Sequence, residues 1–98
     1  MSKAQLYKQA IIKENLKRNP HSEIVYLQNA IDESHNADEI LLAMRTVASA
    51  RGFKKFAAAA DLNRENLYRV LSENGNPRLD TFLKLIDLLG FKLSLKAK

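Results

Sequence analysis

Five polar side chains recur at helical spacing between residues 64 and 72, and together they could read nucleic acid bases. At about 100° per residue, one helix face carries Arg64, Glu65, Tyr68, Arg69 and Ser72. An arginine fork can donate two hydrogen bonds to guanine, and a glutamate can accept one from cytosine. A tyrosine or serine hydroxyl can contact phosphate or a base edge. We interpret all five as candidate base contacts. Asn63 is a sixth, provided that capping the helix leaves its amide free to reach adenine.

The other face of this segment is apolar, and an alanine-rich segment precedes it. Leu67, Val70 and Leu71 share that face and are expected to pack into a core. The sequence "FAAAA" at residues 56–60 places small side chains where two helices joined by a short turn must approach closely. Leu62, in the turn, can fill the gap between them. This pattern predicts a helix-turn-helix whose second helix enters the major groove of double-stranded DNA.

Residues at both ends of this unit suit the phosphate backbone. They are Lys54 and Lys55 near the start of the first helix, and Asn74, Asn76 and Arg78 in the loop after the second. Contacts of this kind fix the register of a protein on a duplex without reading its sequence. The alternative for each residue is an ordinary exposed side chain. The shared face and the preceding turn favour DNA contact for Arg64 and Arg69 as a pair.

Helices are predicted along most of the chain, because only three glycines and two prolines interrupt it. They span about residues 3–18, 23–33, 37–51, 54–60, 64–72 and 77–89. The second helix carries Ile24, Val25, Leu27 and Ile31. The third has an apolar stripe, made by Ile40, Leu41, Met44, Val47 and Ala48. In the sixth, apolar residues recur at helical spacing: Leu79, Phe82, Leu83, Ile86 and Leu89.

Residue types at the helix ends support these boundaries. Asn19-Pro20 should stop the first helix, because the residue before a proline avoids the helical region. Asn36 is a good cap for the third, with Glu39 at the capping-box position. The third helix should end at Gly52 and the sixth at Gly90. Pro77 fits the first position of the sixth helix, with Asn76 as its cap.

The last residues alternate apolar and polar side chains. This "FKLSLK" segment has the period of a β-strand, and a strand needs a partner, which the same segment of a second subunit could supply. We therefore expect an all-α fold: a five- to six-helix bundle containing a lambda-repressor-like helix-turn-helix, with a short C-terminal β-strand. One compact domain is expected overall. Residues 1–20 would form its N-terminal helix, and residues 21–98 its DNA-binding part and strand.

The net charge of +5 is distributed in blocks. Residues 1–20 hold five basic and one acidic side chain, residues 21–44 hold five acidic and no basic ones, and residues 45–98 hold eleven basic and five acidic ones. Basic blocks favour an anionic partner, nucleic acid first, although a solvated charged surface would give the same composition. The acidic block could bind a basic protein.

Several classes of protein are disfavoured. Without cysteine, the chain has neither a disulfide nor a thiolate metal site. No apolar run is long enough to cross a bilayer, and the start does not read as a secretory signal. His21 and His35, the only histidines, suit surface or cap positions better than a metal site. We expect a cytoplasmic protein with no cofactor, no metal, no membrane contact and no enzymatic activity.

Longer stretches resemble a known family. "RTVASARG" and "LNRENLYRVLSENGNPRLDTFLKLIDLLGFKLSL" are similar to segments of the addiction-module antidote proteins, helix-turn-helix antitoxins of the HigA-like, prophage-associated type. The likeness covers about residues 24–96. It implies a homodimer that represses its own operon at a palindromic operator and neutralises a RelE/HigB-like, RNA-cleaving toxin. Two positions depart from the family: Asp61 stands where glycine is frequent, and Lys54 where serine or threonine caps the helix.

Two apolar segments are candidates for toxin or dimer contacts. They carry Leu6, Ile11 and Ile12 in the N-terminal helix, and Phe91, Leu93 and Leu95 in the tail. For the helix, packing within the bundle is the alternative. Two further functions stay open at this point. One is a stand-alone prophage-type helix-turn-helix regulator without a toxin, and the other is a protein-interaction adaptor that has kept the shape.

Overall fold

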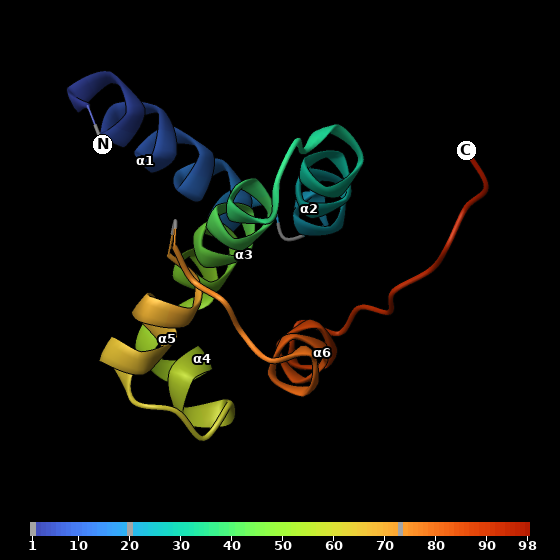
Figure 1. Cartoon of the computed structure of the whole chain (residues 1–98). Coiled ribbons are helices and arrows are strands. Elements are labelled where there is room, and N and C mark those ends of the chain that lie inside the picture. Colours follow the sequence, from blue (N-terminus) through green and yellow to red (C-terminus); the bar gives the residue numbers. More distant parts are fainter. Residues whose placement is uncertain (1, 20, 73) are drawn as a thin grey trace.

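The computed structural model describes residues 2–19, 21–72 and 74–98, most of which lie in helices (Figure 1). These are α1 (Lys3–Arg18), α2 (Ser22–Glu33), α3 (Ala37–Arg51), α4 (Phe53–Ala59), α5 (Arg64–Val70) and α6 (Leu79–Leu88). The all-α class is confirmed, and each predicted helix end lies within two residues of the observed one. None of the described helices combines the length and the apolar character that crossing a membrane requires.

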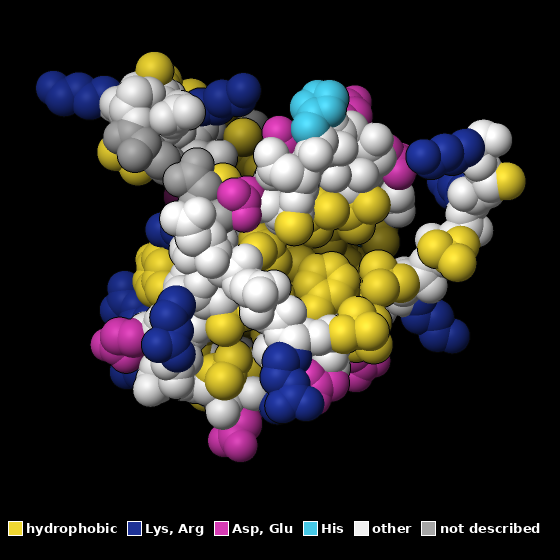
Figure 2. Space-filling model, viewed as in Figure 1, with side chains coloured by type: hydrophobic (Ala, Val, Ile, Leu, Met, Phe, Trp, Pro, Cys, Tyr) yellow, Lys and Arg dark blue, Asp and Glu magenta, His cyan; other side chains and the backbone are white. Residues whose placement is uncertain are grey.

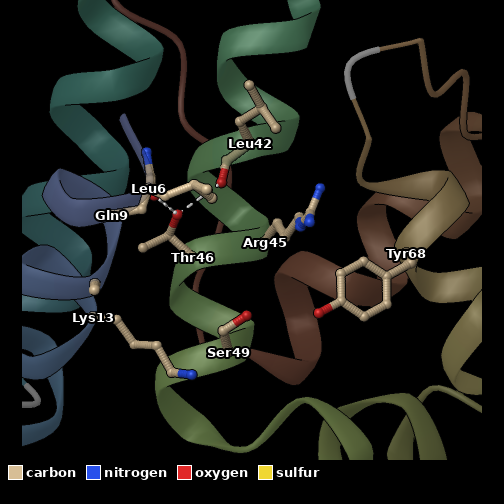
Figure 3. A pocket seen from close by; sticks show the side chains of 9 residues that line it. Leu6, Gln9, Lys13, Leu42, Arg45, Thr46, Ser49 and Tyr68 are labelled. Carbon is tan, nitrogen blue, oxygen red and sulfur yellow. Dashed lines mark hydrogen bonds between the residues drawn. The ribbon is translucent and has the colours of Figure 1, made fainter. Parts of the chain in front are cut away.

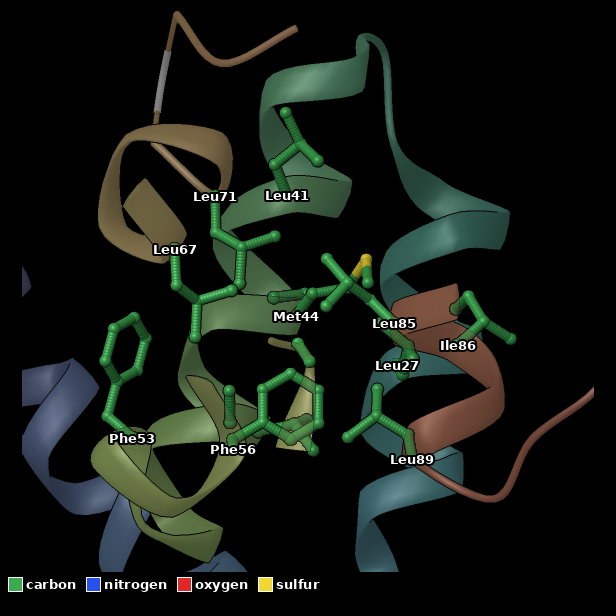
Figure 4. Close-up of a cluster of buried hydrophobic side chains, with 14 of the residues drawn as sticks. Leu27, Leu41, Met44, Phe53, Phe56, Leu67, Leu71, Leu85, Ile86 and Leu89 are labelled. Carbon is green, nitrogen blue, oxygen red and sulfur yellow. The ribbon is translucent and has the colours of Figure 1, made fainter. Parts of the chain in front are cut away.

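Helix α3 lies at the centre of the bundle. Helices α1 and α2 both pack along it, and α4 connects it to α5. Met44 and Val47 of α3 are completely or almost completely buried. In Figure 4, Met44 reaches between Leu67 of α5 and its C-cap residue Leu71 on one side and Leu85 of α6 on the other. Burying each aliphatic side chain of this size stabilises the fold by roughly 1.5–3 kcal/mol. The core therefore fixes α5 against the rest of the chain.

The helix ends follow local chemistry. The Asn36 side chain caps α3, because its Oδ1 accepts a hydrogen bond from the Glu39 N–H at 3.1 Å. The Glu39 carboxylate accepts from the His35 N–H instead of the Asn36 N–H, so the capping box is displaced by one residue. Gly52 and Gly90 have the positive φ angles, 107° and 84°, that let the chain turn where α3 and α6 end. Pro20, the predicted stop for α1, lies outside the described residues.

The predicted start of α6 was wrong. The helix begins at Leu79, Arg78 stands at its N-cap, and no side chain caps it. Asn76 and Pro77 belong instead to the link that carries the chain from α5 to α6 (Figure 1). Because the chain must bridge these two helices, Pro77 lies in the link and not in the first helical turn.

The predicted C-terminal strand was also wrong. Residues 91–98 form an extended tail, and the described part of the chain contains no β-strand. Figure 1 shows the tail leaving the bundle beyond α6. An isolated strand cannot satisfy its backbone groups, and none of the described residues forms a strand with which the tail could pair. Phe91 is half-buried against the core, whereas Leu95 is 100% exposed.

A partly buried ion pair joins three helices. Arg51, the last residue of α3, donates from Nε to Glu23 Oε2 in α2 at 2.6 Å, and from Nη2 to the Leu89 carbonyl after α6 at 2.8 Å. Only 8% of the Glu23 side chain is exposed. With Glu23 turned inward, Ile24 and Val25 lie on the exposed side of α2.

Candidate nucleic-acid interface

Helices α4 and α5 are joined by a tight turn at residues 60–63. Ala57 and Ala60 are buried at the junction, and their small side chains let the two helices approach. The Leu62 N–H donates to the Ala57 carbonyl at 2.9 Å and closes the turn. Asp61 adopts a φ of 58°, a left-handed conformation that favours glycine and that aspartate tolerates better than most residues. The departure from the family pattern at Asp61 therefore leaves the turn intact.

Asn63 fixes the start of α5. Its side-chain Oδ1 accepts a hydrogen bond from the Asn66 N–H at 2.7 Å. Such a cap is worth about 0.5–2 kcal/mol. Because the carbonyl group is engaged in capping, the two-point contact to adenine is not open to Asn63 in this conformation. The side-chain NH₂ remains available to a base or a phosphate.

The outward face of α5 presents charged side chains. Arg64, Glu65 and Arg69 are exposed, while Leu67 on the opposite face is fully buried. Arg69 Nη2 donates to Asn66 Oδ1 at 2.8 Å, which holds the guanidinium along the helix. Asn66 was not among the predicted site residues, although its position three residues before Arg69 is a spacing at which helical side chains meet.

Tyr68 is half-buried rather than projecting freely from α5. Its ring centroid lies 4.3 Å from that of Phe53 in α4. The Arg45 guanidinium of α3 lies 4.6 Å from the centroid of the same ring, and that of Arg64 lies 5.9 Å from it. The ring thus connects the outward, charged face of α5 to the interior of the bundle. Arg45 was not predicted, because it lies far from α5 in sequence.

Ser72 follows the end of α5, and its hydroxyl is already engaged. The side chain is half-buried, and Oγ donates to the Arg69 carbonyl at 2.7 Å. Its lone pairs can still accept a hydrogen bond from a base amino group.

The predicted phosphate contacts lie at the two ends of the α4–α5 unit. Lys54 and Lys55 are exposed in the first turn of α4, and Asn74, Asn76 and Arg78 are exposed in the link to α6. Arg78 Nε lies 3.4 Å from Asp80 Oδ1, but both side chains are highly exposed, so the pair is weak and a phosphate can replace the carboxylate.

Gly75 determines the path of this link. A Cβ built at Gly75 would lie 2.2 Å from the carbonyl oxygen of Val70, at the end of α5. Because that neighbour is backbone, it cannot move aside cheaply. We expect Gly75→Ala to lower the free energy of unfolding by about 1–3 kcal/mol, the usual cost of overpacking, in urea denaturation. Asn74→Ala, at an exposed neighbour, is the matched control and should change it by less than about 0.5 kcal/mol. Equal effects of the two substitutions would contradict this account.

Taken together, fold and surface define an all-helical protein that displays a short polar helix and its basic flanks. Comparison with known proteins identifies the family: residues 3–97 match the model for probable addiction module antidote proteins, and the chain belongs to that family. A protein of Haemophilus influenzae, described only as uncharacterized, is 34% identical over 74 residues, which cover 76% of each chain. No solved structure matches.

Family membership confirms the resemblance noted from the sequence. The chain is a probable addiction module antidote, which implies a toxin as its partner. Antidotes of this family are typically not enzymes.

Proposed function

We propose that this antidote is a sequence-specific repressor of double-stranded DNA that also neutralises a RelE/HigB-like RNase toxin and autoregulates their operon in the cytoplasm. In this proposal α4 and α5 form a helix-turn-helix, and α5 enters the major groove. One observation carries the proposal: on the inner side of α5, Leu67 and the C-cap residue Leu71 are completely buried. On its outer side Arg64, Glu65 and Arg69 are exposed.

Base and phosphate contacts should be separable by mutation. We expect Lys54→Ala and Lys55→Ala each to weaken binding to operator and scrambled duplexes by the same factor. Each should also reduce the slope of log K against log salt by about 1, because a phosphate contact carries no sequence information. Fluorescence anisotropy over a NaCl series measures both quantities. A lysine variant that changed the preference between duplexes would contradict the assignment.

The toxin part of the proposal rests on the family. The exposed acidic side chains of residues 21–44, Asp32 and Glu33 among them, offer a surface to a basic, RNA-cleaving protein. The exposed apolar side chains of α1, including Leu6 and Ile11, offer a second one, whereas Ile12 packs against the core. RNA cleavage by the product of the adjacent gene, with and without the antidote, tests neutralisation directly.

We propose a second copy of the chain as the partner of another apolar face. This face, made by α2, α6 and the tail, includes Ile24, Leu79, Leu83 and Leu93, which are all exposed. Figure 2 shows apolar side chains gathered in the hollow between these elements, and a shallow groove there is lined by α2, α6 and Phe91–Ser94. Leu79 and Leu83 belong to the apolar repeat of the sixth helix, yet they are 71% and 44% exposed.

Charge makes this face self-complementary. Asp32 and Glu33 give α2 an exposed acidic side, while Lys92, Lys96 and Lys98 make the tail basic. In a twofold dimer the tail of each copy can meet α2 of the other, which pairs opposite charges twice and covers the exposed leucines.

A charge placed on the face should break this dimer. We expect Leu83→Asp to be monomeric by sedimentation equilibrium at concentrations where the wild type is dimeric, because an unpaired carboxylate would be buried at the interface. Leu6→Asp, on the exposed side of α1, is the control and should stay dimeric. A dimeric Leu83→Asp variant, or dissociation caused by Leu6→Asp, would place the interface elsewhere.

A further inference from the structure

A cleft of about 280 Å³ lies beside α5. Its walls come from α1, α3 and Tyr68 of α5 (Figure 3). The polar side chains include Lys13 of α1, together with Arg45 and Ser49 of α3. None of the described residues that line the cleft is acidic. The lining therefore supplies hydrogen-bond donors and positive charge from three helices.

The two cations in this cleft are only partly solvated, and no described acidic side chain pairs with them. Lys13 and Arg45 are both half-buried, and within the described residues no carboxylate oxygen lies within 4.0 Å of either group. The Arg45 guanidinium lies 4.6 Å from the centroid of the Tyr68 ring, which fixes it without neutralising it. Removing cations partly from water is unfavourable unless an anion compensates.

Hydroxyl groups complete the donor set. The hydroxyls of Ser49 and Tyr68 make no hydrogen bond to other described side chains. That of Thr46 is already engaged, because its Oγ1 lies within hydrogen-bond distance of Gln9 Oε1 and of the Leu42 carbonyl (Figure 3). In Figure 3 the Tyr68 hydroxyl points toward the side of the cleft where Ser49 lies. Several neutral and charged donors around one space suit an anion with several acceptor oxygens, such as a phosphate group.

The position of the cleft indicates which molecule would supply the phosphate group. One aromatic ring, that of Tyr68, contacts both Arg45 in the cleft and Arg64 on the base-reading face, at 4.6 Å and 5.9 Å. A ligand in the cleft thus lies next to whatever α5 binds. We propose that the cleft between α1, α3 and α5 binds a backbone phosphate of the DNA, at the edge of the groove that α5 enters. This inference rests on the proposed DNA-binding function and extends the interface to α1 and α3.

An acidic side chain of a protein partner is the competing occupant. Two observations favour DNA. The α1 segment carries a net positive charge, and so does the α4–α5 unit on the other side of the cleft, so the cleft continues one basic surface. The ring of Tyr68 also ties the cleft to Arg64, whose partner in the proposed function is a base.

The test removes both cations without removing bulk. The double variant Lys13→Gln/Arg45→Gln is compared with Lys3→Gln/Lys84→Gln, which loses the same charge at exposed positions. Fluorescence anisotropy measures binding to the operator and to a scrambled duplex over a NaCl series. We expect the cleft variant to lose about tenfold in affinity on both duplexes and to reduce the salt slope by about 1, with their affinity ratio unchanged. The control should keep its slope within about 0.3 of the wild type. Thermal unfolding followed by circular dichroism confirms that both variants are folded.

The outcomes separate this inference from the proposed function. Wild type and cleft variant binding alike, with equal slopes, would overturn the phosphate site and leave the proposed function standing. A cleft variant that kept DNA binding but lost the toxin would assign the cleft to the protein partner and overturn the inference as well. Absence of salt-dependent binding by the wild type to any duplex would remove the proposed function, and the phosphate site with it.

Discussion

Replacing Arg64 and Arg69 together with alanine should abolish operator recognition while leaving the fold intact. Each arginine is expected to contribute about 1–3 kcal/mol of binding, so the pair contributes about 2–6 kcal/mol, or roughly 30-fold to 10⁴-fold in affinity. The Arg69 guanidinium is held before DNA arrives by Asn66 Oδ1 at 2.8 Å, and that of Arg64 lies 5.9 Å from the centroid of the Tyr68 ring. Less side-chain entropy is then lost on binding, which places the effect toward the upper end.

The distinguishing result is the loss of base preference. The double arginine variant should bind operator and scrambled duplexes equally, with the residual affinity of a phosphate-binding surface. A Lys54→Ala/Lys55→Ala variant has the same change in charge and should keep the operator preference. Because both arginines are exposed, thermal unfolding of the arginine variant should match the wild type. An arginine variant that still preferred the operator would mean that another surface reads the bases.

Glu23→Ala should be among the most destabilising substitutions outside the apolar core. It would leave the Arg51 guanidinium without the carboxylate oxygen that now lies 2.6 Å from Nε. Breaking a buried ion pair at one partner costs about 3–5 kcal/mol. Because 34% of the Arg51 side chain is exposed, water can partly replace Glu23, so we expect about 3 kcal/mol. That is a large share of the 5–15 kcal/mol by which domains are usually stable.

A double-mutant cycle tests this link. Urea denaturation of Glu23→Ala, Arg51→Ala and the double variant should give a coupling energy of more than about 1 kcal/mol. Asp32→Ala, an exposed acid on the same helix, is the control and should change stability by less than about 0.5 kcal/mol. Additive effects at Glu23 and Arg51 would contradict the role of the ion pair in joining α2 and α3 to the end of α6.

Local signals in the sequence predicted most of the helices. Asn36 and Asn63 cap helices through their own side chains, and Gly52 and Gly90 supply the turns after α3 and α6. The tail could not be predicted in the same way. Alternation of apolar and polar residues fits a strand, but whether a strand forms depends on a partner that a single chain does not provide.

The candidate site was predictable where it depends on one helix. The helical period alone placed Arg64 and Arg69 opposite Leu67. In the structure both arginines are exposed and Leu67 is buried. Tyr68 lies on the same predicted face, yet its ring is half-buried because it packs against Phe53 and Arg45. These neighbours come from other helices, and so do the walls of the cleft, so spacing along α5 carries no information about them.

Protection of guanine N7 from methylation by dimethyl sulfate tests the central claim most directly, because N7 lies in the major groove, where the arginines of α5 are proposed to bind. On the promoter of its own operon, the wild-type protein should protect guanines in two half-sites about 10–10.5 base pairs apart, or a multiple of that spacing. The Arg64→Ala/Arg69→Ala variant should lose this protection even at concentrations where it still occupies the DNA. Bound wild-type protein that left every N7 reactive, or protection that survived in the double variant, would contradict the account.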